Sequence, residues 1–101
     1  MVKLTALYGH PADVDAFEAY YINVHMPLVT KIPGLGRTER ARVIRTPGGG
    51  KPAYHRIFEF WFASPEQMEA TLATPEMQAA VADLDNFAHD NVTILVAEVE
   101  V

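Results

Sequence analysis

The sequence predicts an α+β protein of the ferredoxin-like type, a four-stranded antiparallel sheet with helices on one face. Two helical segments carry apolar residues at three- and four-residue spacing, one at about 13–30 and one that starts at 64 in two pieces. Four further segments alternate in the period of a strand, at 2–8, 37–46, 53–63 and 91–101. The resulting order βαββαβ is that of the split βαβ motif.

Length and composition exclude several classes of protein. The 101 residues suit a single domain, 1–101. Thirteen acidic and eight basic residues give a formal net charge of −5, which argues against a nucleic-acid partner. The absence of cysteine excludes disulfides, thiolate metal sites and a cysteine nucleophile. No apolar run reaches the roughly 18 residues that cross a bilayer, so we expect no membrane segment and a cytoplasmic protein.

The first helix is predicted to begin after the N-cap Asp13 and to run to about Thr30, with Phe17, Val24 and Leu28 facing the core. Pro27 lacks a backbone N–H and clashes with the carbonyl four residues earlier. We therefore expect the helix to kink or end there, with His25 in its last full turn. A helix C-terminus favours the protonated form of an imidazole.

A second stripe of this helix carries groups that can do chemistry. Glu18, Tyr21 and His25 follow one another at three- and four-residue steps, so their side chains are predicted to lie within reach of one another. The simpler interpretation is that a single histidine on a helix is a surface or capping residue.

The third strand segment, 53–63, has two different faces. Phe58, Phe60 and Phe62 share one face and suit packing under the helices. Ile57, Glu59 and Trp61 share the other, where mixed polar and aromatic groups suit a pocket. The simpler interpretations are that Glu59 pairs with an arginine and that Trp61 packs in an interface. The segment 37–46 is predicted to be a partly exposed edge strand with solvated arginines.

The remaining segments have clear ends. Ser64-Pro65-Glu66-Gln67 matches a capping box, and Thr74-Pro75 repeats the pattern of a cap followed by proline. Helices on one face leave the other face uncovered, with Ile57, Trp61 and aliphatic residues of the last strand. Monomers rarely expose such a patch, so a homodimer that packs these faces together and encloses a cavity is predicted.

One string of residues resembles the EthD family. It is Phe17-x-x-Tyr20-Tyr21-x-x-x-His25-x-Pro27-Leu28-Val29, followed by Pro33-Gly34-Leu35, and the opening Leu7-Tyr8-Gly9-His10-Pro11 also fits. The resemblance spans nearly the whole chain and implies a small dimeric α/β barrel. Family members are often labelled reductases, and relatives in polyketide pathways are linked to dehydration.

The candidate site combines three catalytic and four substrate-binding residues. His25 would move a proton, a carboxylate such as Glu59 would hold its tautomer, and Tyr21 would stabilise a developing oxyanion. The substrate-binding candidates are Tyr8, Trp61, Pro27 and Ile57. His10 and His55 are weaker candidates.

Two functions follow from such a pocket. One is a cofactor-independent oxidoreductase, dehydratase or isomerase acting on a small hydrophobic or aromatic carbonyl compound. The other is a carrier that binds such a compound for a partner oxidase. We expect no bound cofactor, because the sequence has neither a dinucleotide fingerprint nor a flavin loop. We expect no metal, because no histidine motif has ligand spacing. Similar barrels can hold haem through one histidine, but the sequence shows no distinctive haem signal.

Overall fold

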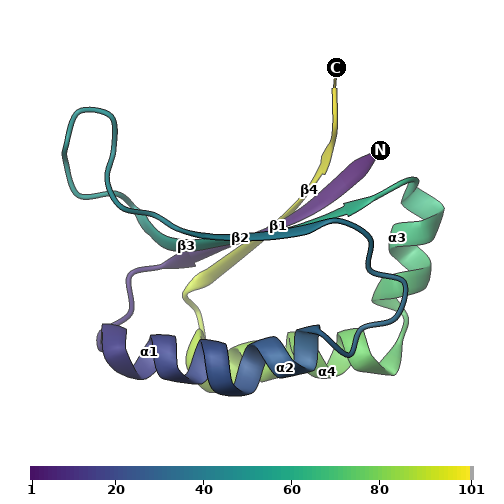
Figure 1. The fold of residues 1–101 in the computed structure, drawn as a ribbon, viewed down its shortest axis with the longest axis horizontal. Coiled ribbons are helices and arrows are strands. Elements are labelled where there is room, and N and C mark those ends of the chain that lie inside the picture. Colours follow the sequence, from purple (N-terminus) through teal and green to yellow (C-terminus); the bar gives the residue numbers. More distant parts are fainter. Residues whose placement is uncertain (101) are drawn as a thin grey trace.

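The computed structural model describes residues 1–100 and has the predicted element order, with the helical segments subdivided (Figure 1). The strands pair antiparallel in the order β2-β3-β1-β4, which confirms the ferredoxin-like α+β fold. Val101, predicted to end the last strand, lies outside the described residues. The elements are β1 (Val2–Gly9), α1 (Val14–Tyr20), η1 (Tyr21–His25), α2 (Met26–Val29), β2 (Thr38–Arg42), β3 (Tyr54–Phe62), α3 (Pro65–Leu72), α4 (Pro75–Phe87) and β4 (Val92–Glu98).

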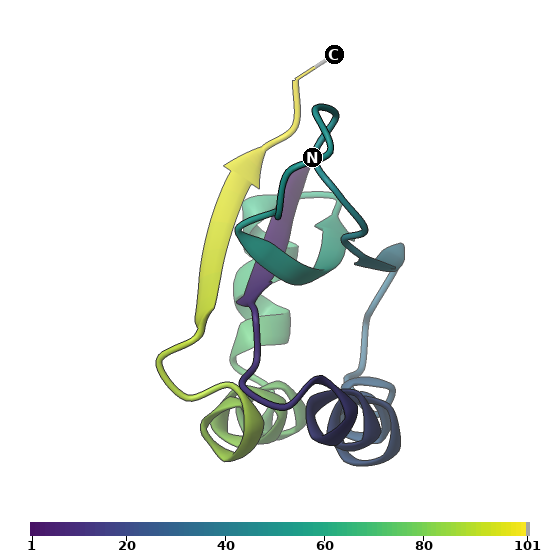
Figure 2. The ribbon, with the colours of Figure 1, turned by 90° about the vertical axis from the view of Figure 1, so that its left-hand side faces the viewer.

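The helices form a layer along one face of the sheet. Figure 2 shows the α1–η1–α2 rod and α4 side by side below the strands, while α3 descends at the end of β3 to connect the layers (Figure 1). None of the helices described in residues 1–100 lies on the opposite face of the sheet (Figures 1 and 2). No helix within residues 1–100 is both long and apolar enough to cross a membrane.

Strand register assigns each side chain to one of these two faces. β1 pairs with β3 so that Ala6 lies opposite Phe58 and Leu4 opposite Phe60, and all four are buried under the helices. This confirms that the phenylalanine face packs against the helices. The residues on the other side of the sheet, the open face, are Lys3, Thr5, Leu7, Glu39, Ala41, Ile57, Glu59, Trp61, Thr93, Leu95 and Ala97.

The first helix ends at the predicted place, with Thr30 as its C-cap, and its irregularity lies just before Pro27. The Asp13 N-cap is confirmed, because its Oδ1 accepts the Ala16 N–H at 3.0 Å. The helical chain, however, does not end at Pro27. A π-helical turn, η1, precedes the proline, with the Met26 N–H bonded to the Tyr21 carbonyl, and α2 continues to Val29. A wider turn needs no hydrogen bond from the proline nitrogen to the carbonyl four residues earlier.

The π-helical turn also changes which residues face the core. An extra residue in one turn rotates the following side chains around the helix axis. Val24, predicted to be buried, is 43% exposed, whereas Tyr21, His25 and Val29 are buried. This rotation carries His25 from the edge of the helix to its inner face.

The other local predictions are largely confirmed. Ser64 and Thr74 cap α3 and α4 by accepting the N–H groups of Gln67 and Met77. Strand β2 is exposed along its length at the sheet edge, and it is shorter than the predicted segment 37–46. β4 is likewise shorter than 91–101.

Candidate functional site

A small cavity, here called the inner cavity, lies between the helix layer and the sheet. Its volume is about 40 Å³, room for a few water molecules. Tyr8 and His25 are its polar lining residues. The remaining lining residues are apolar and come from three strands, from α2 and α4, and from the turn after α2: Ala6, Val29, Ile32, Phe58, Phe60, Met77, Ala80, Val81, Leu84 and Ile94.

The imidazole of His25 is hydrogen-bonded to a buried carboxylate. Its Nδ1 lies 2.9 Å from Oδ2 of Asp83, a buried residue of α4. The other oxygen of Asp83 accepts the Tyr20 hydroxyl at 2.6 Å and the Asn86 side-chain N–H at 3.0 Å. Because an ionised carboxylate only accepts, the Nδ1 of His25 donates and its Nε2 carries the free lone pair.

The pKa values of His25 and Asp83 are both lowered, which leaves the imidazole neutral and the carboxylate ionised. Burial lowers the pKa of His25, although the hydrogen bond to Asp83 opposes the shift. Burial raises the pKa of Asp83, but hydrogen bonds from Tyr20, Asn86 and His25 outweigh it, so the net shift is downward. The site therefore pairs a neutral imidazole with an ionised carboxylate. His25 does not lie at a helix end, because α2 continues to Val29, and burial is the main cause of its lowered pKa.

Two buried tyrosines adjoin His25. Burial raises the pKa of Tyr21 to about 12 and that of Tyr8 further still, so both phenols keep their protons. The Tyr21 ring lies 6.0 Å from the His25 ring and 5.7 Å from the Tyr8 ring. The Tyr21 hydroxyl is buried and has no hydrogen-bond partner within residues 1–100. Such a group is a donor available to a ligand or a water.

The sheet separates the predicted site into two groups. Glu59, Ile57 and Trp61 lie on the open face, whereas Tyr8, Tyr21 and His25 lie on the helix side. The prediction that Glu59 and Trp61 share one pocket with His25 is therefore wrong. Glu59 instead binds Lys3 at 2.8 Å and Thr5 at 3.2 Å.

Two further candidates also lie away from the inner cavity. The Trp61 ring faces the Arg37 guanidinium, with 4.3 Å between the guanidinium carbon and the ring centroid. The Pro27 ring is exposed on α2 and does not line the cavity. Pro27 follows the turn that carries His25, so any influence on a ligand would be indirect.

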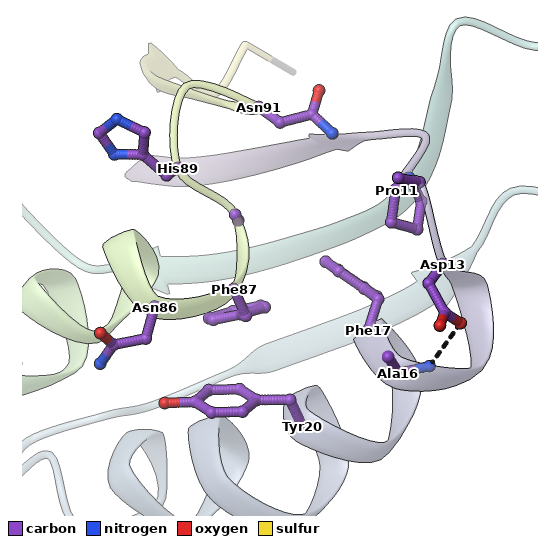
Figure 3. Close-up of a pocket in the computed structure, with 11 residues that line it drawn as sticks. Pro11, Asp13, Ala16, Phe17, Tyr20, Asn86, Phe87, His89 and Asn91 are labelled. Atoms are coloured by element: carbon purple, nitrogen blue, oxygen red, sulfur yellow. Dashed lines mark hydrogen bonds between the residues drawn. The ribbon is translucent and has the colours of Figure 1, made fainter.

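A larger groove opens on the outside of the helix layer (Figure 3). Its volume is about 420 Å³, within the range of small-molecule sites. This outer groove is formed by Pro11, Ala12, Asp13, Ala16, Phe17, Tyr20, Asn86, Phe87, Ala88, His89 and Asn91. Phe87 forms part of its wall and also lies against His25, with 4.7 Å between the ring centroids.

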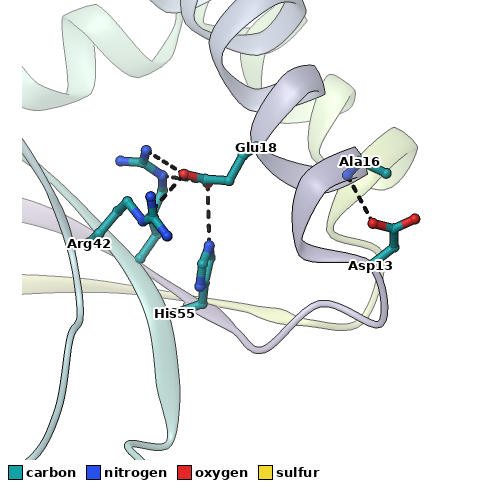
Figure 4. A network of polar contacts seen from close by, with 6 residues as sticks. Asp13, Ala16, Glu18, Arg42 and His55 are labelled. Atoms are coloured by element: carbon teal, nitrogen blue, oxygen red, sulfur yellow. Dashed lines mark hydrogen bonds and ion pairs between the residues drawn. The ribbon is translucent and has the colours of Figure 1, made fainter.

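Glu18 takes part in a different network from the one predicted (Figure 4). Its two oxygens accept Nε and Nη2 of Arg56, both at 2.9 Å, and one of them lies 3.3 Å from the Nε2 of His55. Arg42 adds an ion pair at 3.5 Å. Glu18 therefore joins α1 to the sheet rather than to His25. Within residues 1–100, no group of three or more His, Asp or Glu side chains is placed to hold a metal ion.

Sequence reasoning missed Asp83, although a signal was present. Asp83 lies three residues after Ala80 and four before Phe87, on the apolar stripe of α4. A carboxylate on a buried stripe needs a partner. Because α4 lies beside η1, that partner is His25.

The helices and the ferredoxin-like sheet enclose an apolar cavity lined by His25, and such a cavity suits a small-molecule-binding domain. The EthD domain model matches residues 9–91, and the chain belongs to the EthD family. It is 35% identical over 100 residues to an uncharacterised 11.0 kDa protein from the thcB-thcC intergenic region of Rhodococcus erythropolis, covering 99% of this chain and 96% of that one.

Solved structures agree with this assignment. The crystal structure of an EthD family protein from Bacillus halodurans superposes with a TM-score of 0.92 at 34% identity, covering 99% of both chains. A dimeric ferredoxin-like protein of unknown function from Thermobifida fusca superposes with a TM-score of 0.69 at 14% identity, covering 97% of this chain and 90% of that one. The second likeness concerns the fold alone.

Proposed function

We propose that this protein binds a small hydrophobic or aromatic carbonyl compound and moves a proton on it, with His25 as the general base. One observation carries the proposal: the Nδ1 of His25 is engaged by Asp83, so that a basic Nε2 is left on a residue that lines an apolar cavity. Proton transfer between carbon and oxygen is the step shared by isomerases and dehydratases.

The proposed step uses groups already in place. A C–H bond next to the carbonyl breaks, the proton goes to the Nε2 of His25, and the electron pair moves to the carbonyl oxygen. The Tyr8 phenol, which stays protonated and lines the same cavity, donates a hydrogen bond to the resulting enolate oxygen. Asp83 stabilises the imidazolium formed at His25 and keeps its ring oriented.

Exchange of the α-carbon proton for solvent deuterium tests the proton abstraction, whatever product the complete reaction gives. Aryl ketones and β-diketones are incubated with the protein in D₂O, and deuterium at the α-carbon is measured by NMR. His25→Gln should lower the exchange rate by roughly 10²–10⁴-fold, the usual contribution of a general base. Binding without exchange by the wild-type protein would instead favour the carrier function.

The same proposal includes a homodimer formed through the open face. Leu95 on that face is 50% exposed, and Ile57 and Trp61 lie two strands away. Exposed apolar groups of this kind suit an interface between copies. The ferredoxin-like protein of Thermobifida fusca, which shares the fold, is described as dimeric.

A further inference from the structure

The inner cavity is too small for the ligand that the proposed function requires. About 40 Å³ accommodates a few waters, whereas sites for small molecules usually enclose about 300–1,000 Å³. The outer groove, at about 420 Å³, is large enough for a small molecule. Phe87 of α4 lines the outer groove and lies 4.7 Å from the ring of His25, which lines the inner cavity. Phe17, the other groove residue near the inner cavity, lies 5.7 Å from Tyr8 rather than against the imidazole.

Aromatic rings form the floor of the outer groove. The Phe87 ring stacks on Tyr20, with 5.1 Å between the centroids and 24° between the planes, and lies 5.4 Å from Phe17. Side-chain amides of Asn86 and Asn91 stand at the rim (Figure 3). Flat apolar walls with a few polar groups at the edge fit a planar aromatic ligand.

Phe87 is placed so that it can move. It is the last residue of α4, it is only partly buried, and the turn to β4 follows it directly. Its inner side contacts His25, whose ring centroid is 4.7 Å away. Displacement of this one ring would connect the outer groove with the imidazole, whereas the surrounding floor stays in place.

We propose that the outer groove is the binding subsite for the planar aromatic part of the ligand, and that Phe87 controls access of its carbonyl end to His25. This inference rests on the proposed function, since it supplies the route by which a substrate of that class reaches the general base. It also assigns ligand selectivity to a residue that does not take part in proton transfer.

The binding part is tested with 2-naphthol as the probe. Ala16 is exposed on α1 and lines the groove, whereas Ala19 is exposed on the same helix outside it. Ala16→Trp should fill the groove and weaken 2-naphthol binding at least about tenfold, the factor that corresponds to 1.4 kcal/mol. Ala19→Trp should leave the affinity unchanged. Equal affinity for both variants and the wild type would overturn the subsite.

The access part is tested by chemical modification of His25 with diethyl pyrocarbonate, followed by mass spectrometry. Phe87→Ala should speed the modification of buried His25 at least tenfold, with exposed His10, which lines neither space, as the internal reference in the same sample. Ile94→Trp tests the alternative route: Ile94 and Val81 are exposed and line the side of the inner cavity between α4 and β4.

The opposite pattern would contradict the inference. If Ile94→Trp slows modification of His25 and Phe87→Ala does not change it, the ligand enters between α4 and β4. That result would leave the proposed proton transfer intact, because α-carbon exchange by the wild type and its loss in His25→Gln are measured independently. Conversely, if Ala16→Trp and Phe87→Ala give the expected results but the wild type shows no α-carbon exchange, the subsite is supported and the proposed proton transfer fails.

Discussion

The two faces of the sheet each carry a carboxylate bound to a basic partner, and the two pairs differ in burial. On the open face, the side chains of Lys3 and Glu59 are 34% and 21% exposed. Under the helices, those of His25 and Asp83 are 5% and 8% exposed. Water screens the first pair, so its net stabilisation is small. The second pair is desolvated, so each group depends on its partner.

This difference explains why only one face has a candidate general base. Burial lowers the pKa of His25, so the imidazole stays neutral, and three hydrogen-bond donors keep Asp83 ionised. On the open face, hydrogen bonds and charge from Lys3 lower the pKa of Glu59, so that its carboxylate remains an anion and a weak base. The helix-covered face therefore suits proton transfer, and the open face suits contact with a second copy.

The largest expected effect is on stability, from removing the buried carboxylate. Asp83→Ala leaves the buried Nδ1–H of His25 without an acceptor, which costs about 1–3 kcal/mol, and it also removes the acceptor of the partly buried Tyr20 hydroxyl. We expect a total loss of roughly 3 kcal/mol in urea unfolding. The matched variant on the open face, Glu59→Ala, should cost less than about 1 kcal/mol. Equal losses would contradict the distinction between the faces.

The pH dependence of the free energy of unfolding should reflect the titration of the His25 imidazole. Its folded pKa lies below the reference value of 6.5, so the unfolded chain takes up the proton first. The stabilisation is therefore complete above about pH 6.5 and is lost as the pH falls toward the folded pKa, with a slope of at most about 1.4 kcal/mol per pH unit. Urea unfolding at pH 5 to 8 measures this slope.

Two variants identify the group responsible for that slope. His25→Gln should remove most of the loss between pH 6.5 and 5. Asp83 has a lowered pKa too, but its contribution is lost only below its reference value of 3.8. Exposed His89 has a raised pKa and the opposite sign, so its stabilisation is lost as the pH rises. A loss of stability between pH 6.5 and 5 that persists unchanged in His25→Gln would show that the buried pair does not control the pH dependence.

The open face is tested through assembly. Leu95→Glu places a charge on the proposed interface and should weaken the dimer at least about tenfold, since a charge left in an apolar contact is desolvated. Light scattering at micromolar concentrations measures the mass. Ile44→Glu, at an exposed position in the β2–β3 connection, is the control and should leave the mass unchanged. A wild-type monomer at these concentrations would contradict the dimer.

The smallest effect is expected at Pro27. Its ring is exposed, so Pro27→Ala should change the free energy of unfolding by less than about 1 kcal/mol. The alanine allows a regular α-turn in place of η1, which would rotate His25 on its helix. We therefore expect Pro27→Ala to change the free energy of 2-naphthol binding more than the free energy of unfolding. A large loss of melting temperature with unchanged affinity would show that Pro27 is only structural.

Much of the fold could be read from local patterns. The caps Asp13, Ser64 and Thr74 mark helix starts because their side chains accept N–H groups two or three residues on, a purely local interaction. Alternation along 53–63 separated Phe58 from Glu59 for a similar reason, because successive side chains of a strand point to opposite faces. In β1 the same alternation puts Tyr8 with the buried residues, although the sequence prediction combined Tyr8 and Glu59 in one site.

The site was decided by the tertiary structure. His25 and Asp83 are 58 residues apart, and only the packing of α4 beside η1 brings their side chains together. The π-helical turn that points His25 inward arises from the balance between a local hydrogen bond and core packing, which no residue spacing encodes. The sequence by itself determined which elements form and, outside the first helix, which faces they bury, because those depend on near neighbours. Which carboxylate meets the imidazole depended on contacts between distant elements, and therefore on the folded chain.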